Sequence, residues 1–199
     1  MRIKELVRFV DFLSAFPCIK RKNKIKGKSD FENDAEHSYQ LALAAWYFAE
    51  TLQLPVQRQL VLEYALAHDL VEIYAGDTDA FLNNSDEYLI SKQEREQAAF
   101  ERIKAEFPGF VSLHQSIHGY ERRADIESKL VYLVDKILPD INIFLSGDSY
   151  YKDRGVSFES WKDWFNSKIA KIGIKDERVL ILVDELIEFQ KSSGIFSKE

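Results

Sequence analysis

A histidine and an aspartate stand next to each other in the middle of an apolar stretch. His68 and Asp69 lie between Val61 and Ala75, where almost every other side chain is apolar, and Glu72 follows about one helical turn later. An unpaired charge is very unfavourable inside a protein, so these groups need a partner. Imidazole and carboxylate together suit a divalent metal ion, and the ion supplies the charge that makes their burial tolerable. The dipeptide therefore predicts a metal site.

Two other apolar segments supply further candidate ligands. His37 lies in the first turn of NDAEHSYQLALAAWYFA, and Asp135 lies in the middle of ESKLVYLVDKILPD. Taken singly, each has an ordinary interpretation, because a lone histidine at a helix start is often a core or capping residue and a lone buried aspartate is often an ion-pair partner. Together with the dipeptide, they form a much more specific pattern of His37, His68-Asp69 and Asp135.

Such a ligand set suits the hydrolysis of phosphate esters. Four protein ligands leave two positions on an octahedral ion, one for water and one for a phosphate oxygen, and the ion lowers the pKa of the water and offsets phosphoryl charge. Glu72 and Asp77 can then orient or deprotonate the water, or protonate the leaving alkoxide. We favour Asp77 on the side of the water and leaving group, with Glu72 as its partner.

The elements that position these residues are predicted to be helices throughout. Apolar periodicity indicates helices and no convincing strand, Asn33 or Asp34 can cap the helix of His37, and Gly76 can end the helix of His68. We expect an all-α fold with one domain over residues 1–199, a signature core at about 30–140, and helices over 157–191 packed on it. The expected helices span residues 2–15, 34–53, 56–75, 86–106, 110–118, 124–145, 157–171 and 176–191.

Composition limits the classes of function. The 199 residues are 46% hydrophobic and 30% charged, and the longest apolar run, Leu41 to Ala49, is far shorter than the ~20 residues of a membrane span. A net charge of −6 argues against general nucleic-acid binding. The single cysteine, Cys18, excludes an internal disulfide and a multi-cysteine zinc site, and the amphipathic amino terminus is unlike a signal peptide. We expect a cytoplasmic protein that binds neither nucleic acid nor a membrane.

The sequence resembles the HD-domain phosphohydrolase superfamily, in particular its small bacterial members related to deoxyribonucleoside 5′-monophosphatases. The matching segments are FENDAEHSYQLAL, AHDLVEIYAGDT and GYERRADIESKLVYLVDKILP, and the likeness runs from about residue 5 to residue 170. The resemblance implies a helical fold, one divalent ion (Mn, Co, Zn, Mg or Fe) and a homodimer. It implies that Glu72 and Asp77 are catalytic. It also implies four metal ligands, which are His37, His68, Asp69 and Asp135.

Basic residues gather at positions 20–28. The ordinary interpretation is a solvated loop, and the alternative is a lip that attracts a phosphorylated ligand. Arg21 is singled out as a substrate-binding residue because the resembling sequences carry an arginine about a dozen residues before the NDAEH string, and a guanidinium can bind phosphate through two hydrogen bonds. Ala15-Phe16-Pro17 stands where those deoxynucleotidases have Arg-Trp-Pro, so a preference for deoxyribose is not implied.

His114 and His118 are four residues apart and can share a helix face. They could bind a second ion, as binuclear members of the superfamily do. Gly119 is expected to end their helix, and the resembling proteins place no ligand there. We therefore favour an ordinary role for both histidines.

Three functions are compatible with these patterns. The leading hypothesis is a metal-dependent phosphohydrolase of nucleotide phosphate esters, most directly a nucleoside 5′-monophosphate phosphatase. The alternative is a nucleoside triphosphate triphosphohydrolase, which the basic residues at 20–28 keep open. The third is a non-catalytic domain that binds a nucleotide or a partner. Such a domain normally shows an eroded motif, whereas every expected ligand and both carboxylates are present here.

Overall fold

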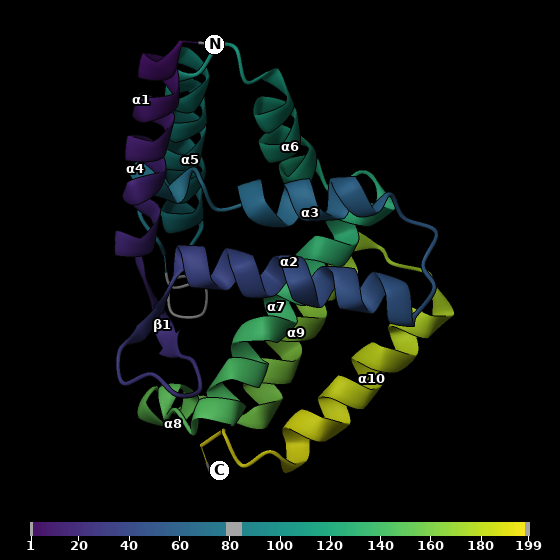
Figure 1. Cartoon of the computed structure of the whole chain (residues 1–199). Coiled ribbons are helices and arrows are strands. Elements are labelled where there is room, and N and C mark those ends of the chain that lie inside the picture. The colour runs from purple at the N-terminus through teal and green to yellow at the C-terminus, as the bar shows by residue number, and fades with distance from the viewer. Residues whose placement is uncertain (1, 79–84, 198–199) are drawn as a thin grey trace.

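Helices dominate the structure (Figure 1), a computed structural model that describes residues 2–78 and 85–197. In it, α2 (Asp34–Thr51) crosses the middle of the molecule over α7 (Ile126–Ser146), and α3 (Arg58–Ala67) packs against both. The predicted helical fold is confirmed. None of the described helices is long and apolar enough to cross a membrane. The other helices are α1 (Ile3–Ser14), η1 (Phe16–Cys18, a 3₁₀ turn), α4 (Glu72–Ala75), α5 (Asp86–Glu106), α6 (Val111–Arg122), α8 (Tyr150–Asp153), α9 (Phe158–Ile172) and α10 (Glu177–Ser192).

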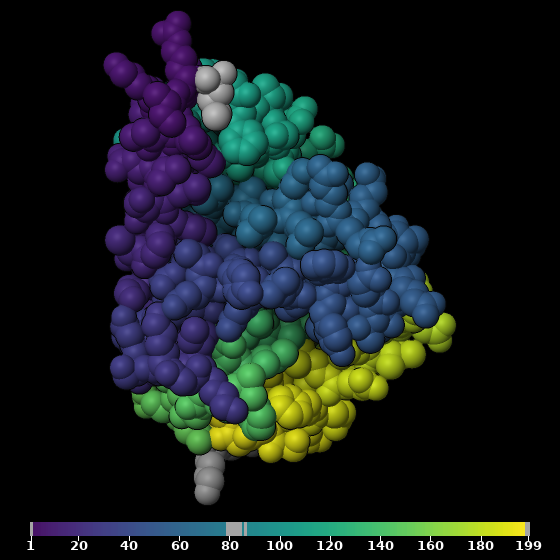
Figure 2. Space-filling model, viewed as in Figure 1, coloured from purple at the N-terminus to yellow at the C-terminus, as the bar shows by residue number. Residues whose placement is uncertain are grey.

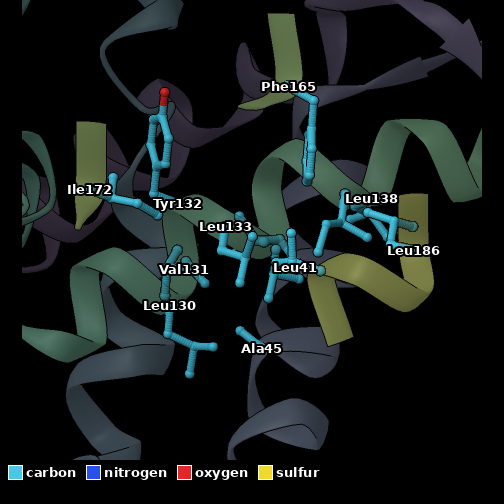
Figure 3. Close-up of a cluster of buried hydrophobic side chains, with 14 of the residues drawn as sticks. Leu41, Ala45, Leu130, Val131, Tyr132, Leu133, Leu138, Phe165, Ile172 and Leu186 are labelled. Atoms are coloured by element: carbon cyan, nitrogen blue, oxygen red, sulfur yellow. The ribbon is translucent and has the colours of Figure 1, made fainter. Parts of the chain in front are cut away.

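The larger apolar core holds α2 against α7 and continues into α9 and α10 (Figure 3). Leu41 of α2 and Val131 of α7 are fully buried in it. Leu41 follows His37 by four residues and Val131 precedes Asp135 by four, so the helix faces that build the core also carry this polar pair. Packing of the core therefore fixes His37 opposite Asp135.

A second apolar cluster lies on the other side of the His68-Asp69 dipeptide. It joins Phe12 of α1, Leu70 and Val71 to buried side chains of α5 and α6. Tyr64, four residues before His68, belongs to the larger core instead. The dipeptide thus lies where the two apolar clusters meet, and both clusters hold its backbone in place.

The predicted helix over residues 56–75 is wrong in its second half. The α3 helix ends at Ala67, residues 68–71 form turns, and the single-turn α4 follows. The backbone N–H groups of Leu70 and Glu72 donate to carbonyls three residues back, at 3.2 and 2.8 Å, rather than four. Gly76 ends α4 with a φ of 76° and a ψ of 148°, a conformation taken almost only by glycine, which costs other residues about 1–3 kcal/mol. The apolar periodicity could not show this break, because the side chains remain apolar through it.

The expectation of no strands is also wrong, because residues 20–33 form a hairpin. Its strands β1 (Lys20–Lys24) and β2 (Phe31–Asn33) are antiparallel. Lys20 lies opposite Asn33 and Lys24 opposite Phe31, with an irregular register between the two pairs. Polar contacts hold the hairpin: the Lys24 amide donates to an oxygen of Asp148 at 2.8 Å. A strand of the sequence KRKNK has no apolar alternation, so hydrophobic periodicity could not detect it.

Gly119 does not end the sixth helix, contrary to the prediction of a helix over 110–118. It lies inside α6, where a Cβ atom would come 2.5 Å from the hydroxyl oxygen of Tyr64. That hydroxyl donates to Asp125 at 2.9 Å, and Asp125 caps the first turn of α7. Glycine at this position therefore allows α6 to pack closely against α3, which carries the dipeptide at its end.

Candidate metal centre

The four predicted ligands meet between α2, α7 and the turn after α3. His37 Nε2 lies 3.0 Å from Asp135 Oδ1, and His68 Nε2 lies 2.8 Å from Asp69 Oδ2. His68 Nε2 also lies 3.9 Å from Asp135 Oδ1, which joins the two pairs. One ligand atom each from His37, His68 and Asp135 lie within 4.8 Å of one another, close enough to share an ion.

His68 directs Nε2 toward this group. Its Nδ1 lies 2.9 Å from the carbonyl oxygen of Ala65, which can only accept, so Nδ1 carries a proton. In the neutral ring Nε2 then offers a lone pair, and it makes no hydrogen bond with the described residues although Asp69 Oδ2 is 2.8 Å away. Two acceptors at this distance repel each other unless a cation or a proton lies between them. The geometry therefore fits a metal-binding imidazole, whose other nitrogen is commonly held by a carbonyl oxygen.

His37 is fully buried and faces a carboxylate at each ring nitrogen. Nε2 faces Asp135, and Nδ1 lies 3.7 Å from Glu32 Oε1. Burial and the charge of Arg21 lower the pKa of His37, but hydrogen bonding to Asp135 and Glu32 outweighs them and raises the pKa overall. A carboxylate behind a metal-binding histidine fixes the orientation of its ring. Glu32 occupies this position behind the candidate ligand His37, and it is not among the residues predicted from the sequence.

Glu32 is itself held from two sides. It is fully buried, and its oxygens accept hydrogen bonds from Asn23 at 2.9 Å and from Asn142 of α7 at 3.1 Å. The carboxylate therefore ties the hairpin to α7 and to His37. The signal in the sequence was a carboxylate five residues before His37, but its role became visible only with the hairpin.

Arg21 of β1 reaches the same group of carboxylates. Its Nη1 lies 3.0 Å from Asp69 Oδ2 and 3.5 Å from Asp34 Oδ1, and its Nε lies 3.6 Å from Glu32. Burial lowers the pKa of Arg21, but Asp69, Asp135 and Glu32 raise it well above the ordinary value. The hairpin thus places Arg21 against a predicted metal ligand, not out on a solvated loop.

Further carboxylates surround the ligands. Oxygens of Asp34, Asp69 and Glu72 lie within 4.8 Å of one another. Burial, followed by the charge of Asp69, raises the pKa of Glu72 well above its usual value and that of Asp34 to about 6. Burial also raises the pKa of Asp77, although Arg21 opposes it. Burial thus favours the protonated form of these carboxyl groups, and a carboxyl group that holds a proton can act as a general acid.

Asp34 is the second residue of the site that was not predicted from the sequence. It directly follows Asn33, and either residue could have capped α2. The structure assigns the cap to Asn33, whose side chain accepts from the Glu36 amide at 3.1 Å. Asp34 is left fully buried beside Glu72, with Oδ2 unpaired among the described residues.

Asp135 keeps its negative charge through contacts on its other oxygen. Oδ2 accepts from Lys136 Nζ at 2.7 Å and from the hydroxyl of Tyr120 at 3.3 Å. Burial alone would raise the pKa of Asp135, but Lys136 and His37 bring it well below the usual value. Asp135 is therefore a carboxylate, the form that binds a metal.

Two cavities lie beside these residues. The smaller, of about 100 Å³, is lined by Arg21, Asp77 and Asp135. The larger, of about 230 Å³, is lined by His68, Asp69 and Asp135. Because Asp135 lines both, the candidate metal centre lies between the two cavities.

The remaining histidines lie outside this site. His114 is half-buried, and His118 is exposed and stacks on Phe100 with ring centroids 6.4 Å apart. Within residues 2–78 and 85–197, neither joins a group of His, Cys, Asp or Glu side chains that could hold an ion. The structure therefore gives no support for a second metal site at His114 and His118.

Comparisons with known proteins also indicate a metal-dependent phosphohydrolase. The HD domain family model matches residues 18–175. The chain is similar to a predicted metal-dependent phosphohydrolase from Magnetospirillum magnetotacticum, with 26% identity, a TM-score of 0.80, and coverage of 99% of this chain and 96% of that one. A conserved hypothetical protein from Pyrococcus furiosus shares the fold at 21% identity and a TM-score of 0.64, over 92% of this chain and 99% of that one. No curated protein matches.

Proposed function

The chain belongs to the HD domain family, and from this premise we propose that it is a metal-dependent phosphohydrolase of nucleotide phosphate esters, most directly a nucleoside 5′-monophosphate phosphatase. The observation that carries the proposal is the buried lone pair of His68 Nε2, which faces Asp69 and Asp135 without a hydrogen bond. The similar structure from Magnetospirillum magnetotacticum is a predicted enzyme of the same class. The nucleotide substrate itself is inferred from the resemblance and the basic hairpin.

The proposed roles follow from the contacts. His37, His68, Asp69 and Asp135 would hold one divalent ion (Mn, Co, Zn, Mg or Fe). A bound ion of this kind lowers the pKa of water and offsets the phosphoryl charge. Glu72 and Asp77 carry the proton transfers, since burial holds both pKa values above the ordinary range.

The test is a panel of nucleoside mono-, di- and triphosphates with several divalent metals, scored for phosphate, pyrophosphate and triphosphate. We expect phosphate release that depends on the metal. Discrimination between AMP and dAMP should be less than ~10-fold, because Ala15 and Phe16 offer no polar anchor for the sugar. Release of triphosphate would favour the alternative enzyme. No release from any nucleotide would favour a binding domain.

The structure of the basic hairpin gives the triphosphate alternative less support than its sequence does. Lys20 pairs with Asp30 at 2.6 Å, and Lys28 pairs with Glu36 at 2.5 Å. Arg21 and its neighbour Lys22 line the smaller cavity. Most of the hairpin's charge is thus already paired or lies away from the site.

Arg21 is proposed to bind the substrate phosphate in the smaller cavity. Arg21→Lys should lower kcat/KM about 10-fold on every nucleotide alike, because lysine keeps the charge but lacks the planar pair of donors. Metal content by elemental analysis should stay unchanged. Arg122→Lys, the same change on an exposed part of α6, serves as the control. Loss of metal instead would show that Arg21 acts by holding Asp69, and an effect confined to one base or sugar would contradict the role.

A homodimer is proposed from the resemblance and from the exposed face of α2. Tyr39, Leu43, Trp46 and Tyr47 are exposed along this helix, which lies at the surface in Figure 2. Contiguous apolar patches of this kind mark interaction sites. A molar mass by light scattering near the 23.2 kDa of one chain would contradict the dimer.

A small-molecule nucleotide remains the proposed partner. We propose no binding to nucleic acid or to a membrane, and the cytoplasmic location stays a prediction.

A further inference from the structure

One buried carboxylate, that of Glu32 in β2, faces two groups of the proposed site at once. Its Oε1 lies 3.7 Å from Nδ1 of His37, and its Oε2 lies 3.6 Å from Nε of Arg21. Both distances are longer than an ordinary hydrogen bond. His37 belongs to α2 and Arg21 to β1, so a single side chain lies between a candidate metal ligand and the residue proposed to bind phosphate.

Each oxygen of Glu32 also accepts one hydrogen bond from a neutral amide. Asn142 of α7 donates to Oε1 at 3.1 Å, and Asn23 donates to Oε2 at 2.9 Å from β1, which lies against α7 (Figure 1). An ionised carboxylate can accept about four hydrogen bonds, two at each oxygen. One acceptor position therefore remains on Oε1 for His37 and one on Oε2 for Arg21.

The nitrogens that face Glu32 have no other hydrogen-bond partner in the described part of the chain. Nδ1 of His37 and Nε of Arg21 are both buried, and neither makes a hydrogen bond with residues 2–78 or 85–197. A buried donor that stays unpaired is unfavourable. For Nε2 of His37 to offer its lone pair to a cation, the hydrogen of the neutral ring has to lie on Nδ1. Glu32 is thus the carboxylate that both donors need.

A side chain that only held the hairpin would not need the negative charge of Glu32. The amide of a glutamine can also bond to two asparagine side chains, and neutral amides offset a buried charge poorly. Within 4 Å of Glu32, the described residues offer two ion-pair partners, which are Arg21 and His37. The charge is therefore directed at the proposed site as well as at the hairpin.

We propose that Glu32 is a positioning residue that orients His37 and Arg21 together, so that one carboxylate sets both the metal ligand and the phosphate-binding guanidinium. This inference rests on the proposed function and adds a residue to its site. Arg21 also contacts Asp69 through Nη1 at 3.0 Å, so two of its nitrogens are held by different carboxylates. Loss of Glu32 should therefore weaken the binding of metal and of phosphate, although the residue touches neither.

The first test measures the affinity of the metal-free protein for Mn²⁺ by titration calorimetry. Glu32→Gln keeps the size of the side chain but removes its charge and one acceptor oxygen. We expect at least ~10-fold weaker binding of Mn²⁺, the low end of what partners of metal-binding histidines contribute. Glu36→Gln is the control and should keep the wild-type affinity, because Glu36 pairs with Lys28 of the hairpin at 2.5 Å and not with a residue of the site.

The second test measures binding of inorganic phosphate to protein saturated with Mn²⁺, so that a weaker metal site does not obscure the result. Glu32→Gln and Arg21→Lys should each weaken phosphate binding about 10-fold, since one removes the carboxylate that orients the guanidinium and the other its planar donors. The double variant should bind little more weakly than either single variant, because residues that act together give non-additive effects. Additive losses would show that Arg21 does not depend on Glu32 and would overturn the proposal.

Asn142→Ala distinguishes positioning from a purely structural role. It removes a hydrogen bond between α7 and the hairpin but leaves the charge of Glu32 in place. We expect a lower Tm of the metal-free protein, with an affinity for Mn²⁺ closer to the wild type than to Glu32→Gln. Equal losses of affinity in Asn142→Ala and Glu32→Gln, or wild-type affinity in Glu32→Gln, would overturn the proposal. If circular dichroism shows that Glu32→Gln does not fold, Glu32→Asp, which draws both oxygens back by one carbon, is judged by the same outcomes.

These binding measurements also separate the role of Glu32 from the proposed function. If no nucleotide is hydrolysed but Glu32→Gln weakens the binding of both Mn²⁺ and phosphate, the proposed function fails and the positioning role stands. If nucleotides are hydrolysed and Glu32→Gln binds both ligands as the wild type does, the positioning role alone is overturned. A loss confined to Mn²⁺ would make Glu32 a partner of His37 only and would overturn its link to Arg21.

Discussion

His68→Ala and Asp69→Ala are expected to lose bound metal and activity together. Each change removes one ligand from a set of four, and His68 also supplies the lone pair that makes no hydrogen bond with the described residues. Each variant keeps three of the four predicted ligands, including His37 and Asp135, which lie 3.0 Å apart, and three ligands form an incomplete site. Metal content by elemental analysis, measured beside turnover, is the deciding observation.

Matched controls separate ligand loss from general damage. His118→Ala changes an exposed histidine on α6, and Asp163→Ala an exposed aspartate on α9, so both should keep their metal. Asp69→Asn keeps the shape of the side chain but removes the charge, and it should lose metal while far-ultraviolet circular dichroism stays unchanged. A full metal complement in both His68→Ala and Asp69→Ala would show that the site is assigned wrongly.

The candidate ligands could be selected from the sequence because buried ionisable residues stand out in apolar segments. His37 and Asp135 each sit in a helix whose neighbours form the core, and the structure brings both beside His68. Local periodicity was enough to find these helices. It could not show that the helix breaks after Ala67, since the break is made by backbone hydrogen bonds and not by a change in apolar content.

The residues that prediction missed depend on contacts between distant parts of the chain. Glu32 is recognisable only once the hairpin is paired and Asn142 has reached it from α7. The sequence allowed Asp34 to be the residue that caps α2, so it did not stand out as a site residue. The structure shows that Asn33 is the cap. In each case the information lies in packing, which periodicity does not contain.

Glu72→Ala and Asp77→Ala are expected to keep the metal and lose at least ~100-fold in turnover, the low end of what acid–base groups contribute. Asp77 belongs to no group of candidate ligands among the described residues, and Glu72 lies outside the group of His37, His68 and Asp135, although its carboxylate lies within 4.8 Å of those of Asp34 and Asp69. Asp77 lines the smaller cavity with Arg21, where it can reach a bound phosphate ester. Glu72 is buried beside Asp34 and Asp69. Elemental analysis and turnover are measured on the same samples, with Glu94→Ala on the exposed face of α5 as the control.

Glutamine in place of Glu72 distinguishes proton transfer from a structural role. Burial and the charge of Asp69 raise the pKa of Glu72 well above its usual value and so favour the protonated carboxyl group, and glutamine reproduces the shape and hydrogen-bonding capacity of that neutral form. If Glu72 only fills space and hydrogen-bonds, Glu72→Gln should retain turnover where Glu72→Ala loses it. If Glu72 passes a proton to or from Asp77, glutamine should fail as badly as alanine, because an amide cannot exchange that proton. We expect the second result, and near-normal turnover in Glu72→Gln would assign the residue a structural role.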